Sequence, residues 1–244
     1  PLLLLGIAGI MNQSIDKIIF PMVYPDPAEG MRELGIYGAC FKVAMVMMMF
    51  TYAFRFAYEP FVFAKNEEKD SKTTYADAMK YFVITTLLIF LCIVAYIDVF
   101  QLLLGPRYRA GIRVVPIVLM AYFFQGVMYN LSLWYKLVDR TMFGALFSLV
   151  GLVITLIINI LFIPVCSYMA CAWASLVSAV VMVVMSYAFG QKYYPINYDL
   201  KRIGFYFVLS MVLFAGMCFF AFNNVVLNIL YRTLLVGLFV AVAL

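Results

Sequence analysis

The sequence contains no histidine and few charged residues. Asp, Glu, Lys and Arg make up 12% of 244 residues, against about 25% in a soluble domain. Without histidine there is no Ser–His–Asp or Cys–His catalysis and no metal site with imidazole ligands. The five cysteines stand singly in apolar stretches without a C-x-x-C pair, which argues against a zinc or redox motif. We therefore predict no catalytic residues and no metal site.

Apolar residues make up 67% of the chain, whereas soluble domains have about 45–50%. A water-facing surface would then consist mainly of large apolar side chains, which soluble proteins avoid. The composition therefore predicts a protein embedded in lipid. The net charge of +5 is spread thinly over the loops, which suits anionic lipid headgroups and not nucleic acid.

Eight apolar stretches approach or exceed the roughly 20 residues that a helix needs to cross a bilayer. They are continuously apolar and lack the alternation of barrel strands. We expect an all-α, polytopic transmembrane helix bundle of about eight spans, taken from a longer protein. The predicted spans are Leu2–Tyr24, Leu34–Lys65, Met79–Leu104, Val114–Leu133, Met142–Val165, Tyr168–Phe189, Ile203–Phe222 and Val225–Leu244.

The distribution of Lys and Arg between the loops predicts the orientation. They are more numerous on the side that holds Lys65, Lys136 and Lys192 than on the opposite side. We expect that side and the N-terminus to be cytoplasmic.

Charged residues inside the predicted spans are candidates for function, because a charge at the bilayer centre is costly. Arg55 and Glu59 are spaced i, i+4 and can pair on one helix face, so a structural ion pair remains open. Lys42 has no acid at helical spacing. It either extends to the interface or faces a cavity and binds an anionic headgroup.

Polar stripes mark several of the predicted helices. In the first, Asn12, Gln13, Asp16 and Lys17 share a face, which indicates either an inter-helix hydrogen-bond seam or an ion or proton site around Asp16. Uncharged stripes on later spans serve packing or line a wet interior. Their members include Tyr122, Gln125 and Tyr129, then Thr155 and Asn159, and Ser175.

Several motifs, taken in their order and spacing, give the chain a resemblance to a known family. It resembles the polysaccharide flippases, which transport O-antigen and capsule repeat units and belong to the multidrug/oligosaccharidyl-lipid/polysaccharide exporter superfamily. The resemblance covers essentially the whole chain. Its motifs are Ile15–Lys17 (IDK), Gly35–Gly38 (GIYG), Phe54–Phe61 (FRFAYEPF), Gly105–Tyr108 (GPRY), Asn159–Pro164 (NILFIP) and Ala170–Ser175 (ACAWAS).

The resemblance implies the second lobe of a two-lobe, alternating-access transporter. Residues 1–189 would form its six-helix C-terminal lobe, and residues 190–244 would add two C-terminal helices. The implied function is translocation of undecaprenyl-diphosphate-linked oligosaccharide across the bacterial inner membrane, for lipopolysaccharide or other surface polysaccharide. Partners would be that lipid-linked oligosaccharide, membrane lipids and the polysaccharide polymerase or ligase machinery.

The resemblance also gives roles to the polar residues within the spans. Lys42 matches a basic position that faces the cavity in relatives, and we predict cargo contacts for it and for other residues with cationic or hydroxyl groups. A sodium or proton site is expected from the position of a bound sodium ion in related flippases, and no other cofactor is expected. The predicted substrate-binding residues are Lys42, Lys17, Arg55, Tyr122, Gln125 and Tyr129; the predicted ion-coupling residues are Asp16, Thr155, Asn159 and Ser175.

Two other functions compete with the flippase reading. A multidrug antiporter of the same superfamily would export organic cations and would need acidic and aromatic groups in its cavity. A membrane enzyme such as a polysaccharide polymerase would be expected to carry a large outer loop with clustered catalytic groups. The outer loops here are short, although three arginines cluster between Arg107 and Arg113, so we do not expect an enzyme.

Overall fold

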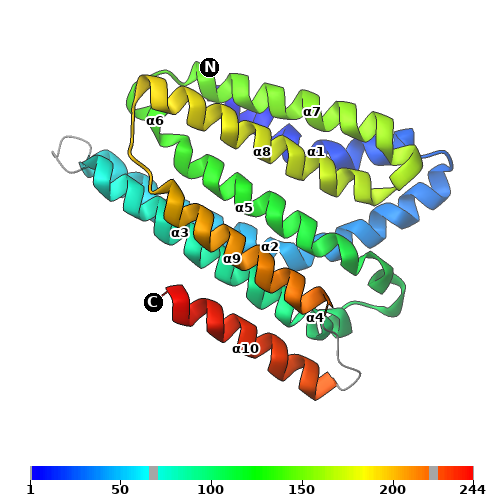
Figure 1. The fold of residues 1–244 in the computed structure, drawn as a ribbon. Coiled ribbons are helices and arrows are strands. Elements are labelled where there is room, and N and C mark those ends of the chain that lie inside the picture. The colour runs from blue at the N-terminus through cyan, green and yellow to red at the C-terminus, as the bar shows by residue number, and fades with distance from the viewer. Residues whose placement is uncertain (1, 66–70, 220–224, 244) are drawn as a thin grey trace. The chain divides into compact units, whose positions relative to one another are not determined.

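The computed structural model describes residues 2–65, 71–219 and 225–243, with the side chains of 2–10, 12, 13, 65, 103, 225 and 226 left outside the description. Its described residues form helices joined by short connections, without a β-strand (Figure 1). The all-α prediction is therefore confirmed. The elements are α1 (Leu2–Val23), α2 (Pro27–Lys65), α3 (Ser71–Ala95), α4 (Ile97–Leu103), the 3-10 helix η1 (Pro106–Val114), α5 (Val115–Leu131), α6 (Leu133–Leu137), α7 (Met142–Cys166), α8 (Tyr168–Tyr193), α9 (Leu200–Phe219) and α10 (Val225–Ala243).

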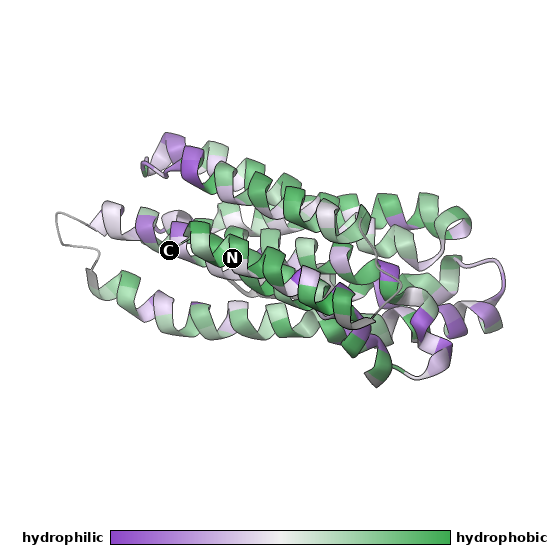
Figure 2. Ribbon diagram, turned by 60° about the horizontal axis from the view of Figure 1, so that its bottom comes forward, coloured by the Kyte–Doolittle hydropathy of each residue, from purple (hydrophilic) through white to green (hydrophobic). Residues whose placement is uncertain are grey.

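Within the described residues, six helical segments are long and apolar enough to cross a membrane. Figure 2 shows hydrophobic residues along most of the helices. These features support a multi-pass membrane protein. The six segments are Pro27–Ala64, Ser71–Ala95, Pro106–Leu137, Met142–Cys166, Tyr168–Tyr193 and Leu200–Phe219.

The other two predicted spans also fall on helices. They coincide with α1, of 22 residues, and α10, of 19 residues. At about 1.5 Å per residue, each is close to the roughly 30 Å thickness of the hydrocarbon core. The count of eight spans nevertheless stays a prediction, because the described part of α10 is shorter than a full span.

Helix α2 begins at Pro27, before the apolar stretch that starts at Leu34. Asp26 explains the early start, because its side chain accepts a hydrogen bond from the backbone N–H of Ala28 at 2.9 Å. An Asp at the N-cap followed by a proline in the first turn is a favourable helix start. The polar first turns of α2 therefore extend the helix beyond its apolar part.

The described chain divides into two compact units. Unit 1 comprises α1, α2, η1 and α5 to α8, and unit 2 comprises α3, α4, α9 and α10. The predicted boundary between a six-helix lobe, residues 1–189, and two additional helices, residues 190–244, remains a prediction.

In unit 1, α7 packs between α1 and α8, while α5 packs against α8 and α2. Small residues line the buried faces of α7 and α8, including Gly144, Gly151, Ala174 and Ser178. Such residues let helix backbones approach closely in a membrane. The helices that carry the predicted site residues are therefore held tightly against one another.

η1 also packs closely against α2. Gly111 makes this possible, since a Cβ atom at this position would lie 2.6 Å from Ile36 Cγ2 and 2.9 Å from Cys40 Sγ. Both distances are shorter than van der Waals contact. The close approach of η1 to α2 therefore depends on the missing side chain.

In unit 2, an ion pair and a contact between two hydroxyl groups connect α10 to the segment around α4. Arg232 on α10 donates to Asp98 on α4 at 2.8 Å. Tyr96 lies 3.1 Å from the Thr233 hydroxyl. Because α3 packs against both α9 and α10, these contacts fix α10 at the C-terminal end of α3.

Candidate functional site

Asp16 is the most deeply buried carboxylate among the described residues. It lies on α1 with 2% of its surface exposed. The Tyr37 hydroxyl on α2 donates to Asp16 Oδ2 at 3.0 Å, and the backbone N–H of Lys17 donates to Oδ1 at 2.9 Å. A buried charge is tolerated only when such donors compensate for lost hydration. The fold thus builds a specific environment for this group.

Lys17 and Phe41 connect α1 to the aromatic groups of α2 and α5. Lys17 Nζ lies over the Phe41 ring, 4.2 Å from its centroid. Phe41 in turn meets the ring of Tyr122 edge to face, at 5.5 Å between centroids. The cation of Lys17 is therefore stabilised by an aromatic face beside the buried Asp16.

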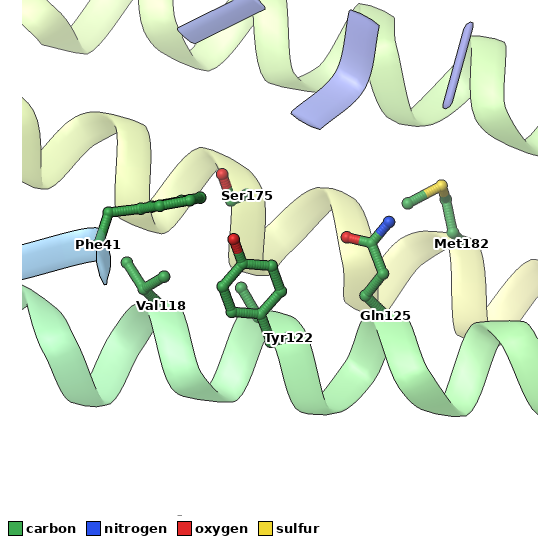
Figure 3. Close-up of a pocket in the computed structure, with 7 residues that line it drawn as sticks. Phe41, Val118, Tyr122, Gln125, Ser175 and Met182 are labelled. Atoms are coloured by element: carbon green, nitrogen blue, oxygen red, sulfur yellow. The ribbon is translucent and has the colours of Figure 1, made fainter. Parts of the chain in front are cut away.

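A small cavity opens among α2, α5 and α8, and three predicted site residues line it. Figure 3 shows the hydroxyl groups of Tyr122 and Ser175 and the amide of Gln125 along this cavity. The cavity has a volume of about 30 Å³. Since a water needs roughly 10–15 Å³ by this measure, the cavity fits one or two waters or a small ion. It is far too small for a lipid-linked oligosaccharide.

A second cavity of about 10 Å³ lies between α2 and α5. Tyr122 and Gln125 line this cavity as well, together with Tyr129. Gln125 Nε2 approaches the Tyr129 hydroxyl at 3.4 Å. Tyr122, Gln125 and Tyr129 of the predicted uncharged stripe therefore lie together along α5, and their role stays a prediction.

Asn159 on α7 is fully buried, and both polar atoms of its side chain lack a hydrogen-bond partner in the described structure. Thr155, one turn earlier, donates to the Gly151 carbonyl at 2.9 Å, and Ser178 of α8 donates to the same carbonyl at 3.0 Å. An unsatisfied buried amide costs roughly 1–3 kcal/mol. A buried amide of this kind needs an explanation, for instance a bound ion or water that interacts with its polar atoms.

Asp16 and Asn159 lie at matching distances from the ends of two packed helices. Asp16 lies seven residues before the end of α1, and Asn159 seven before the end of α7. These positions are each about 10 Å from their helix ends. Figure 1 shows α1 and α7 running in the same direction, and the two helices pack together. Ser175 lies seven residues after the start of α8, which follows α7 through Ser167.

The predicted ion-coupling residues are thus only partly united. Asp16, Thr155 and Asn159 are buried on packed helices, whereas Ser175 lines the cavity with Tyr122. The side chains of Asn12 and Gln13 lie outside the described residues. Among the described residues, no three His, Cys, Asp or Glu side chains are grouped for metal binding. A coupling ion here would depend on one carboxylate and on neutral oxygens.

The three cations among the predicted substrate-binding residues occupy different places, apart from the cavity-lining Tyr122, Gln125 and Tyr129. Lys42 is exposed on the face of α2 opposite its buried side, and no other described residue pairs with it. Lys17 lies beside Asp16. Arg55 lies near the C-terminal end of α2, where its guanidinium is 5.0 Å from the Tyr129 ring and its Nε donates to Glu59 at 3.1 Å. The predicted pair of Arg55 and Glu59 is therefore confirmed.

Sequence reasoning missed three residues that complete these environments. Tyr37 lies within the quoted GIYG motif, but nothing in the pattern indicates that its hydroxyl faces Asp16. In the sequence Phe41 is an ordinary apolar residue of the second span, and only the structure shows that Lys17 Nζ lies over its ring. The sequence predicts a loop at Lys136, whereas this residue lies on α6 and pairs with Glu59. Only the charge of Lys136 could have drawn attention to it.

Comparisons with protein-family models, curated proteins and solved structures gave no match. The resemblance to polysaccharide flippases therefore remains a prediction based on the motifs in the sequence.

Proposed function

We propose that this chain is part of a flippase that moves undecaprenyl-diphosphate-linked oligosaccharide from the cytoplasmic to the periplasmic leaflet of a bacterial inner membrane. It would act without a covalent step, as the second lobe of a two-lobe transporter with eight spans in this segment. The motif resemblance supplies the cargo, and the helical, strongly apolar fold is compatible with this role.

The observation that carries the proposal is the buried Asp16 carboxylate. A charge inside apolar helices marks a transport or coupling site by default. Among the described side chains, Tyr37 donates to Asp16, and the packed helix α7 carries Asn159, whose amide has no partner in the described structure. This arrangement suits a sodium ion or proton that binds and leaves as the lobe moves.

Cargo and coupling ion would then use different parts of unit 1. The inner cavity of about 30 Å³ admits an ion or water. The diphosphate and sugars need an open surface, and exposed Lys42 on α2 offers a free cation there. In alternating access one repeat rocks against the other around a fixed site, and an ion bound at Asp16 would bias that movement.

A multidrug antiporter is the second candidate, and one observation favours it. Asp16 lies beside the aromatic pair of Phe41 and Tyr122, and an acid with aromatic rings is a typical environment for an organic cation. Lys17 already occupies the Phe41 face, which weakens this alternative.

A gene deletion tests the proposal in cells. Cells without the gene should accumulate completed lipid-diphosphate-linked oligosaccharide in the cytoplasmic leaflet, and the intact gene should relieve this accumulation. The Asp16→Asn variant should fail to relieve it, whereas Asp77→Asn, at an exposed carboxylate, should succeed. Normal lipid levels and sidedness with raised sensitivity to cationic dyes would instead favour the antiporter.

A further inference from the structure

Arg55, Glu59 and Lys136 form a cluster of two cations around one carboxylate, here called the Glu59 cluster. Arg55 Nε donates to Glu59 Oε1 at 3.1 Å, and Lys136 Nζ donates to the same oxygen. The two cations come from different helices, α2 and α6. The cluster therefore carries an excess of one positive charge, and it joins two segments that are far apart in the chain.

The cations in this cluster retain unused binding capacity. Arg55 has five N–H donors, and only its Nε donates to a described residue. The side chains of Arg55 and Lys136 are 37% and 20% exposed, so both can be reached from outside. The Tyr129 ring beneath the guanidinium limits its orientation. A planar fork with free donors next to a lysine is suited to a phosphate group.

Basic and aromatic residues near the cluster favour a position close to the lipid headgroups. Lys136 follows Trp134 and Tyr135 on α6, and Trp134 stacks on Tyr193 with 5.9 Å between ring centroids. Arg140 also lies over Tyr193, at 4.6 Å. Aromatic rings with flanking basic residues are typical of a membrane–water interface. A phosphate of a lipid headgroup would therefore meet the Glu59 cluster at its own depth.

We propose that the Arg55–Lys136 pair binds the phosphate of a lipid headgroup and that Glu59 occupies this position as an internal anion until the phosphate replaces it. Glu59 keeps the two cations together and oriented in the empty site. Because one carboxylate oxygen satisfies both cations only in part, a phosphate group, which offers several acceptor oxygens to the guanidinium fork and the ammonium, competes well against it. The identification of that phosphate as the diphosphate of the cargo rests on the proposed function. The proposal that the site binds a phosphate does not depend on it.

Binding measurements on the purified protein in neutral detergent test this proposal. Farnesyl diphosphate, titrated by calorimetry, serves as the probe. Arg55→Gln and Lys136→Gln should each weaken binding about tenfold or more, the worth of one charge-assisted hydrogen bond. Glu59→Gln should tighten binding about two- to fivefold, because it removes a competing ion pair of partly exposed groups.

The sign of the Glu59 result separates this proposal from a purely structural ion pair. A structural pair predicts that Glu59→Gln weakens binding or leaves it unchanged, and either result would overturn the proposal. Asp77→Asn is the matched control, since Asp77 is an exposed carboxylate paired with Lys80 at 2.8 Å, and it should leave binding unchanged.

A second measurement needs no variant and therefore does not depend on variant folding. Acylation of lysine side chains, read by mass spectrometry, should slow at Lys136 when farnesyl diphosphate is added, while acylation of Lys80 continues at the same rate. Equal labelling of Lys136 with and without the probe would contradict the proposal.

Competition identifies the source of the phosphate. Short-chain phosphatidylglycerol that fails to displace farnesyl diphosphate would assign the site to a diphosphate lipid such as the proposed cargo. Displacement at equal concentration would support the phosphate site and assign it to bulk anionic lipid. The binding and labelling experiments test the phosphate site, and the gene deletion tests the flippase function. Failure of one can therefore be distinguished from failure of the other.

Discussion

Removal of the Tyr37 hydroxyl tests whether the fold builds an environment for a charged Asp16. Tyr37→Phe keeps the aromatic ring, which is fully buried, and deletes only the donor at 3.0 Å from the carboxylate. Hydrogen bonds to charged groups are worth about 1.5–3 kcal/mol in soluble proteins, and side-chain hydrogen bonds inside membranes average about 0.6 and reach about 1.7 kcal/mol. We expect a loss of about 1–2 kcal/mol in the free energy of unfolding, near the top of the membrane range, because the acceptor is a carboxylate.

A double-mutant cycle with Asp16→Asn isolates this interaction. Unfolding in mixed detergent micelles would be followed by circular dichroism for the protein, each single variant and the double variant. The coupling energy should reach about 1 kcal/mol or more, since the donor matters most to a charged acceptor. Tyr96→Phe is the control, because its hydroxyl contacts the neutral Thr233 at an exposed position, and it should cost little. An equal cost of Tyr37→Phe with and without the Asp16 carboxylate would refute the reasoning.

Three further substitutions probe other parts of unit 1. Lys42→Ala should abolish most cargo export while Lys42→Arg retains it, as measured by surface polysaccharide; equal export by both would remove the headgroup role. Asn159→Leu should raise the thermal unfolding temperature by removing a buried amide without partners, at a gain of about 1–3 kcal/mol. The same variant should lose dependence of export on the coupling ion, and unchanged ion dependence would exclude Asn159 from the site. Gly111→Ala should lower stability by about 1–3 kcal/mol through overpacking against Ile36; an unchanged unfolding temperature would contradict the tight contact of η1 with α2.

The sequence predicts the helices well because apolar stretches of span length have few alternatives. All eight predicted spans fall on helices. The predicted ends of the helices are less accurate where polar contacts decide where a helix stops. The third predicted span is divided at Tyr96 between α3 and α4, although no proline or glycine marks the break. The fourth is interrupted at Ser132, whose hydroxyl bonds back to the Tyr129 carbonyl at 2.6 Å, a known way for serine to disturb a helix.

The candidate site is harder to predict, because helical spacing indicates which residues share a face but not what the face meets. The i, i+4 rule finds Arg55 and Glu59, which lie on one helix. It does not find Lys136, which reaches Glu59 from α6. In the same way, the stripe around Asp16 identifies a special position, whereas its donor Tyr37 lies on another helix. Contacts between helices depend on how α1, α2 and α5 pack against one another, and this packing cannot be inferred from a single sequence.

The exposure of Lys42 shows a related limit. A cation in the middle of an apolar stretch indicates either a cavity or an interface, and the sequence does not distinguish them. The structure places Lys42 on the exposed face of α2, away from the cavity that Tyr122 and Ser175 line. The predicted cargo residues therefore separate into an exposed cation and an enclosed polar face, which spacing along the chain did not anticipate.

Translocation by the purified protein in proteoliposomes tests the central claim most directly. Undecaprenyl-diphosphate-linked oligosaccharide would be placed in the inner leaflet, and its arrival outside would be read with an impermeant lectin while a sodium or proton gradient is applied. The account predicts that the gradient accelerates the arrival, that Asp16→Asn abolishes this acceleration, and that Asp77→Asn leaves it unchanged. Equal rates in vesicles with and without the protein would contradict the account.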